Sequence, residues 1–203
     1  MSAFTVLTQA AVFWWRNWTV MFTLNLGFIL CWLTVLLGPP ATITAYRIAG
    51  DLAQGEEFDP RSVIKYVRRY FLISWGWALL QLAVAAAILV NLNFYASIGG
   101  SAGSLLQGVV LGIALLWVLL QFYTLPYLAL LETPRLWRAL RSALLTLLAS
   151  PFYTLLLALA VGGIIIVLVR FPLLILFGAL MLIIAYAVLA TLERLETFGQ
   201  RSS

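Results

Sequence analysis

The sequence predicts an all-α protein that crosses a membrane five times. Of its 203 residues, 64% are apolar and only 9% are charged, whereas soluble domains are roughly 45–50% apolar and about 25% charged. A water-soluble fold could not bury this much apolar surface. A bilayer accommodates it in helices of about 20 residues, each crossing roughly 30 Å of hydrocarbon. The apolar residues fall into five such runs, which form one membrane domain over residues 1–203.

Residues 1–18 are largely apolar but too short to cross the hydrocarbon as a helix. Their three tryptophans favour a helix at the level of the lipid headgroups, where amphipathic rings concentrate. The first span is expected over residues 19–37, which contain no charge. It should end at residues 38–40, because glycine has low helix propensity and proline lacks an amide donor.

The longest polar interruption is residues 38–70, which we expect to be a cytosolic loop containing a short helix at 41–51. Asp59 followed by Pro60 predicts the start of a second helix, because both residues favour helix initiation at these positions. This second helix is amphipathic, so it should lie on the membrane with its basic face against anionic headgroups. The basic face carries Arg61, Lys65, Arg68 and Arg69.

Four further apolar runs complete the predicted bundle. The amphipathic helix continues into a span at 71–92, and an uncharged, glycine-containing loop is expected at 91–104. Pro126 is expected to kink or end the third span. Thr133-Pro134 repeats the pattern of a cap followed by proline, and Ser150-Pro151 breaks the fourth apolar run. The remaining spans are 105–131, 152–169 and 173–192.

Lys and Arg are distributed unevenly between the two ends of these spans. When the loops are assigned alternately, ten of the twelve basic residues fall on one side and two on the other. Because cytosolic loops carry an excess of basic residues, the amino terminus is predicted outside and the carboxyl terminus in the cytosol. If Arg170, at the tight reversal between the last two spans, does not reach the far face, those spans form a re-entrant hairpin instead.

Three segments resemble a known family. They are Asn17-Trp18 through Asn25-Leu26, Gly38-Pro39-Pro40-Ala41-Thr42-Ile43-Thr44-Ala45-Tyr46, and Val67-Arg68-Arg69-Tyr70-Phe71. Together they are similar to the YesL family of small bacterial integral membrane proteins, over about the first 95 residues. The resemblance implies a location in the bacterial inner membrane and an association with carbohydrate uptake. It implies no established activity and supplies no catalytic residue.

Several kinds of chemistry are disfavoured. The chain has no histidine and one cysteine, which removes the commonest metal ligand and general base and any disulfide within the chain. It has no phosphate loop, zinc-ligand spacing or nucleophile elbow, so we predict no catalytic, cofactor-binding or metal-binding residues. No charge lies within the core of a span, which argues against ion-coupled transport. The net charge of +5 does not indicate nucleic acid, because the basic residues flank apolar runs.

Four side-chain amides fall inside the apolar runs. If they converge near the middle of the membrane, they could hydrogen-bond a neutral hydroxylated solute such as a sugar. The favoured alternative is that they bond neighbouring helices, which stabilises a membrane bundle by roughly 0.6 kcal/mol each and by up to about 2 kcal/mol. The four are Asn25, Gln81, Gln107 and Gln121.

Two further sets of residues are candidate contact surfaces. Pairs of small residues four apart let helices approach closely, and packing inside the bundle is favoured here over a dimer seam. Arginines three apart share one helical face, where anionic headgroups are favoured over an acidic cytosolic partner. The small residues are Gly108, Gly112, Ala158 and Gly162, and the arginines are Arg135, Arg138 and Arg141.

The predicted function is that of a non-enzymatic accessory or regulatory membrane protein. Its link to carbohydrate uptake comes from the family resemblance alone. Its expected partners are anionic lipid and either a transporter subunit or further copies of itself. The alternative is a permease or channel for an uncharged solute, since the spans lack the charges that ion coupling requires.

Overall fold

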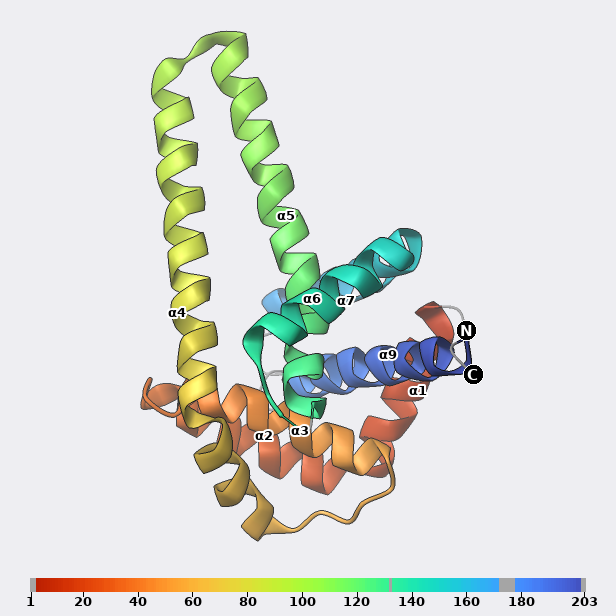
Figure 1. Ribbon diagram of the computed structural model, residues 1–203. Coiled ribbons are helices and arrows are strands. Elements are labelled where there is room, and N and C mark those ends of the chain that lie inside the picture. Colours follow the sequence, from red (N-terminus) through yellow and green to blue (C-terminus); the bar gives the residue numbers. More distant parts are fainter. Residues whose placement is uncertain (1–2, 132, 172–177, 202–203) are drawn as a thin grey trace.

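The computed structural model describes residues 3–131, 133–171 and 178–201 and shows an all-α fold (Figure 1). These residues contain no strand, which confirms the predicted fold class. The helices are α1 (Ala3–Arg16), α2 (Trp18–Leu33), α3 (Gly38–Ala53), α4 (Pro60–Ile98), α5 (Gly100–Leu130), α6 (Leu136–Ala149), α7 (Pro151–Arg170) and α9 (Ala179–Arg201).

Helices α4 and α5 form a long hairpin whose turn projects well beyond the other helices (Figure 1). With 39 and 31 residues, the two helices are about 58 Å and 46 Å long at about 1.5 Å per residue. Their connection is Gly99, which has a φ angle of 68°, and Gly100 follows with 66°. Backbone angles of this kind suit glycine, and they reverse the chain within one or two residues.

The glycine-containing loop expected at 91–104 is therefore wrong. Helix α4 continues to Ile98 because Asn91 and Asn93 do not interrupt it. Their side-chain amides donate to carbonyls of the preceding turn, Asn91 to Ala87 at 2.7 Å and Asn93 to Leu89 at 2.8 Å. Asparagine bonded in this way is tolerated inside a helix, since its side chain does not compete for backbone groups elsewhere.

Helix α3 is the main departure from the sequence prediction. The short helix expected at 41–51 is present and extends over Gly38–Ala53, but most of its residues are buried, whereas the sequence predicts a cytosolic loop over residues 38–70. It packs against α2, α4, α5 and α9. Pro39 and Pro40 begin this helix, because the first amide groups of a helix have no intrahelical partner and proline loses nothing there. A Cβ at Gly38 would lie 2.9 Å from the Trp32 ring, so glycine permits the close approach of α2 and α3.

The first span is shorter than expected. Helix α2 ends at Leu33 and not at residue 37, and the next residues form a turn in which Val35 adopts a φ angle of 58°. That angle is a genuine outlier for a β-branched residue. The 16 residues of α2 extend about 24 Å, which is below the roughly 30 Å of a hydrocarbon core.

Other predicted boundaries hold. Asp59 caps α4 by accepting a hydrogen bond from the Arg61 amide at 2.9 Å, and the amphipathic segment then continues into the second span without a break. The break at Ser150-Pro151 separates α6 from α7. Pro126 lies inside α5 and does not end it, since the surrounding turns are buried against other helices.

Two boundary predictions need correction or fall outside the described chain. Thr133-Pro134 does not cap a helix, because α6 begins only at Leu136 after an extended Arg135. The fifth predicted span, 173–192, begins outside the described residues, and α9 covers it from Ala179 onward. Among the described residues, three helices are long and apolar enough to cross a membrane, namely α4, α5 and α7.

The core lies where α3, α9 and the last turns of α5 meet. Tyr70, Tyr123 and Tyr186 are among its largest fully buried side chains, and alanines of α9 let the neighbouring helices approach. Helix α1 packs along α9 through Val6 and Ala10. The core therefore joins segments from both ends of the chain, while the hairpin leaves it on one side (Figure 1).

Candidate functional site

A partly buried ion pair on α3 is joined to α4 by a tyrosine hydroxyl. Arg47 and Asp51 are one turn apart on α3, and a guanidinium nitrogen (Nη2) of Arg47 lies 2.8 Å from a carboxylate oxygen (Oδ1) of Asp51. The Tyr66 hydroxyl on α4 donates to the other oxygen of Asp51 at 2.7 Å. Burial of Arg47 lowers the pKa of its guanidinium, but the Asp51 carboxylate outweighs this effect and the pKa is raised overall. The Asp51 carboxylate thus compensates the charge of the Arg47 guanidinium.

The same cluster reaches α5 through the Ala129 carbonyl. This carbonyl lies in the last turn of α5, where carbonyl groups have no intrahelical partner. The Tyr70 hydroxyl donates to it at 3.0 Å, and Nη1 of Arg47 approaches it at 3.5 Å. Three helices are thus tied together at one point.

Two reciprocal hydrogen bonds connect the helices of the hairpin. The indole of Trp77 on α4 donates to Gln121 on α5 at 3.0 Å, and the indole of Trp117 on α5 donates to Gln81 on α4 at 2.8 Å. Each helix contributes a tryptophan followed four residues later by a glutamine, so the two bonds are related by an approximate twofold axis. We call these four residues the Trp–Gln clamp. Its register places Gly99 at the centre of the hairpin.

The four predicted amides are not brought together. Gln81, Gln107 and Gln121 all lie in the hairpin, and each bonds the opposite helix, Gln107 through the Leu92 carbonyl at 3.2 Å. Asn25 lies apart from them, fully buried on α2. The convergent solute site suggested by the sequence does not form from these four residues, because α2 packs mainly on α3 and not on the hairpin.

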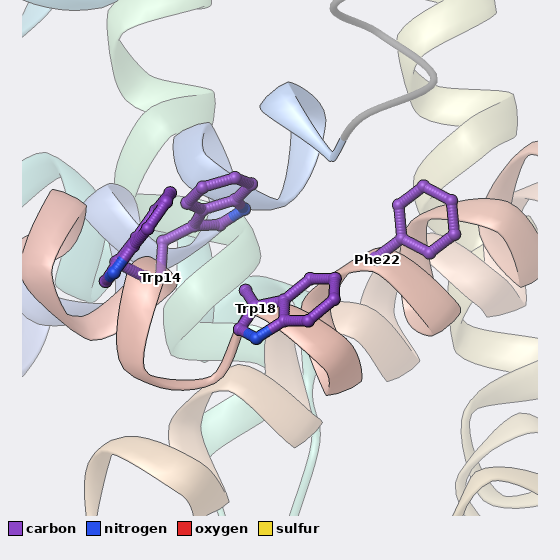
Figure 2. Close-up of a pocket in the computed structure, with 4 residues that line it drawn as sticks. Trp14, Trp18 and Phe22 are labelled. Carbon is purple, nitrogen blue, oxygen red and sulfur yellow. The ribbon is translucent and has the colours of Figure 1, made fainter.

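A pocket of about 590 Å³ opens at the corner between α1 and α2 (Figure 2). It is lined by Trp14, Trp15, Trp18 and Phe22. The Trp14 indole is committed to the fold, since it donates to the Gly178 carbonyl at 3.1 Å and ties α1 to the segment before α9. The other rings present an apolar surface with exposed edges, which suits the headgroup region predicted for this segment.

A second polar cluster links α7 to α9. The Tyr153 hydroxyl donates to Glu193 at 2.7 Å, and the Arg194 guanidinium lies 3.8 Å from the centre of the Tyr153 ring. Nearby, Tyr123 shares a hydrogen bond with Thr154 at 3.3 Å. These contacts satisfy polar groups that would otherwise be costly to bury.

The predicted contact surfaces are exposed, but the small residues do not pack inside the chain. A Cβ added at Gly108, Gly112 or Gly162 would meet no other part of the described chain within 4 Å. The expectation that these glycines pack within the bundle is therefore wrong, because Gly108 and Gly112 face away from the neighbours of α5 and Gly162 faces open space on α7. Ala158 is half-buried on α7. All seven basic residues predicted to contact lipid or a partner are exposed, namely Arg61, Lys65, Arg68, Arg69, Arg135, Arg138 and Arg141.

Fold and site together define the class: an all-α protein with three described helices suited to membrane insertion. Comparisons with protein-family models, with curated proteins and with solved structures found no match. The similarity to the YesL family therefore stays a prediction from the sequence.

Two of the contacts could have been found from sequence signals. Arg47 and Asp51 stand four apart on a predicted helix, the spacing of a helical ion pair. The pattern of tryptophan followed four residues later by glutamine occurs at 77–81 and again at 117–121. The reversal between them puts the two copies at the same level. Pairing the two copies requires the position of the turn, which lies at Gly99 and Gly100, whereas the sequence predicts a loop over residues 91–104.

Proposed function

We propose that this chain is a non-enzymatic integral membrane protein that serves as an accessory or regulatory partner of a membrane transporter. The observation that supports this role is the α4–α5 hairpin. Residues 70–131 contain no charged side chain, and the apolar parts of both helices are almost entirely uncovered by the rest of the chain. Within a bilayer, such a surface contacts lipid or the helices of another protein.

The outer face of α5 favours a helical partner over lipid alone. Gly108 and Gly112 stand one turn apart on this face with open space above them. Small residues at this spacing let two helices approach closely enough for extensive van der Waals contact, which drives helix association where no hydrophobic effect operates. The hairpin thus presents a docking ridge for a transmembrane helix of a transporter.

The setting proposed for this activity follows from the sequence. The YesL resemblance suggests the bacterial inner membrane and a transporter that takes up carbohydrate. The distribution of basic residues favours an outside amino terminus, a cytosolic carboxyl terminus and five crossings. Three of these crossings would use α4, α5 and α7, and the other two would use residues 19–37 and 173–192. Cysteine-accessibility labelling on both sides of residue 170 would test the last crossing.

A second candidate is a permease for an uncharged solute. One observation favours it: the side-chain nitrogens (Nε2) of Gln81 and Gln121 are buried and have no hydrogen-bond partner among the described residues. Two amide donors between α4 and α5 could contact a sugar hydroxyl. The Trp–Gln clamp opposes this function, since the amide oxygens are already used to hold the two helices together.

The deciding experiment is crosslinking and affinity capture of the full chain from native membranes, followed by flux measurements with purified protein. An accessory protein should capture a transporter and show no uptake of labelled sugar into proteoliposomes. The paired change Gly108→Leu and Gly112→Leu should abolish capture, and Gly163→Leu is the matched control because it also faces open space, on α7. Sugar flux by the purified chain alone would refute the accessory role.

A further inference from the structure

An apolar groove of about 360 Å³ lies between α2, α3 and the first turns of α4. Leu24 and Phe28 line it from α2, Ala45 and Ile48 from α3, and Ile64 and Val67 from α4. It is separate from the Trp–Gln clamp and from the α5 face that carries Gly108. Two threonines line the groove, and whereas the Thr23 hydroxyl donates to the Thr19 carbonyl, the buried Thr44 hydroxyl has no hydrogen-bond partner among the described residues.

Thr44 differs from the other buried threonines of the described chain. Thr42, Thr124, Thr146, Thr154 and Thr191 each donate their hydroxyl to the carbonyl four residues earlier. The Thr44 side chain is 3% exposed, lines the groove, and has no hydrogen-bond partner among the described residues. Burying a hydroxyl without a partner costs free energy. A bound molecule with an acceptor oxygen would remove that cost.

Two basic residues of α4 flank Ile64, which lines the same groove. Arg61 and Arg68 stand three residues before and four residues after Ile64, so they share its side of α4. Both are exposed, as is Lys65 between them. Helix α4 carries four basic and no acidic residues between Pro60 and Tyr70, so this side of α4 is positive beyond the acidic residues of the preceding loop. It is thus suited to a phosphate group.

We propose that this groove binds one anionic phospholipid of the surrounding membrane. An acyl chain lies among the apolar side chains, an ester carbonyl accepts the Thr44 hydroxyl, and the phosphate contacts Arg61 and Arg68. A phospholipid supplies an apolar chain, acceptor oxygens and negative charge in that order along one molecule. The site depends on the membrane location and not on the accessory role, because the lipid binds to the chain without a partner protein.

Native mass spectrometry of the purified full-length chain in detergent tests the proposal, with phosphatidylglycerol and phosphatidylcholine titrated separately. We expect one saturable phosphatidylglycerol site, about tenfold tighter than any phosphatidylcholine site, given two favourable charge contacts. Thr44→Val should weaken phosphatidylglycerol binding about fivefold, as expected for one lost hydrogen bond. Thr44→Ser, which keeps the hydroxyl, should retain binding.

Two further pairs of variants locate the site. Ile64→Trp fills the groove and should abolish saturable binding, whereas Leu72→Trp, on an exposed part of α4 outside the groove, should not. The double change Arg61→Gln and Arg68→Gln should remove the preference for phosphatidylglycerol. The corresponding double change of Arg138 and Arg141, which are exposed on α6, is the charge-matched control.

The single cysteine gives an independent readout, because Cys31 also lines the groove. Saturating phosphatidylglycerol should slow its modification by N-ethylmaleimide, and Ile64→Trp should remove the dependence on lipid. The proposal is overturned if both lipids bind equally, or if Thr44→Val and Ile64→Trp leave binding unchanged. Transporter capture is a separate measurement, so a failure of one result does not imply a failure of the other.

Discussion

Breaking the Trp–Gln clamp should weaken the hairpin by an amount that depends on which residues are changed together. Gln121→Leu removes the acceptor of the Trp77 indole, and Trp77→Phe removes the donor. Hydrogen bonds between membrane helices contribute about 0.6 kcal/mol on average and up to about 2 kcal/mol. A bond of 3.0 Å between partly buried groups belongs in the upper half of that range, so we expect each single change to cost about 1 kcal/mol.

A double-mutant cycle isolates the bond from other effects of each change. In the double variant Trp77→Phe with Gln121→Leu, the bond is lost only once, so the coupling energy should be about 1 kcal/mol. The matched control is Trp77→Phe with Gln81→Leu. Trp77 and Gln81 stand one turn apart on α4, but each bonds a different residue of α5. Their coupling should be close to zero.

The free energy of unfolding of the purified chain in mixed micelles, measured by steric trapping, is the appropriate readout. The prediction requires the cross-helix pair to show clearly more coupling than the pair within α4. Equal coupling in the two cycles would mean that the indole and the amide do not bond across the hairpin. The alignment of α4 against α5 would then be wrong, and so would the position of the α5 face that carries Gly108.

Three other changes have distinct expected effects on the free energy of unfolding. Asp51→Asn should cost about 2 kcal/mol, because it leaves Arg47 charged beside a neutral amide. Replacing both residues by leucine should recover most of that loss. No loss in the single variant would contradict the ion pair. Val35→Gly should stabilise the chain by about 1 kcal/mol, since it relieves a positive φ angle in an exposed turn. A destabilised variant would show that the turn is not strained. Gly99→Ala should cost about 1–3 kcal/mol at the hairpin turn, whereas Gly76→Ala, inside α4 with open space around it, should be neutral or stabilising.

Local signals in the sequence predicted the parts of the fold that depend on neighbouring residues. Asp59-Pro60 started a helix, and Ser150-Pro151 separated two, because a cap and a proline act within one turn. Long uncharged runs predicted α4, α5 and α7, since length and hydropathy are properties of the segment itself. The same local rules gave a wrong result at residues 38–40, where two prolines were expected only to end a helix and in fact begin another.

The position of α3 could not be predicted in this way. Its composition is mixed, with Arg47 and Asp51 among small and apolar residues, which is equally consistent with a surface loop. Burial became favourable only because Tyr66 and Tyr70 on α4 and the end of α5 supply partners for those charges. The Thr44 hydroxyl and the Trp–Gln clamp likewise involve segments that meet only after folding.

By itself, the sequence determined that the chain is helical, that it contains helices suited to a membrane, and that it has no histidine. These conclusions depend on composition and on patterns within one segment. Tertiary structure decided which polar groups are paired, which glycines face outward and where a groove forms. Each of these depends on the distance between residues far apart in the chain, and that distance is set by how the helices pack.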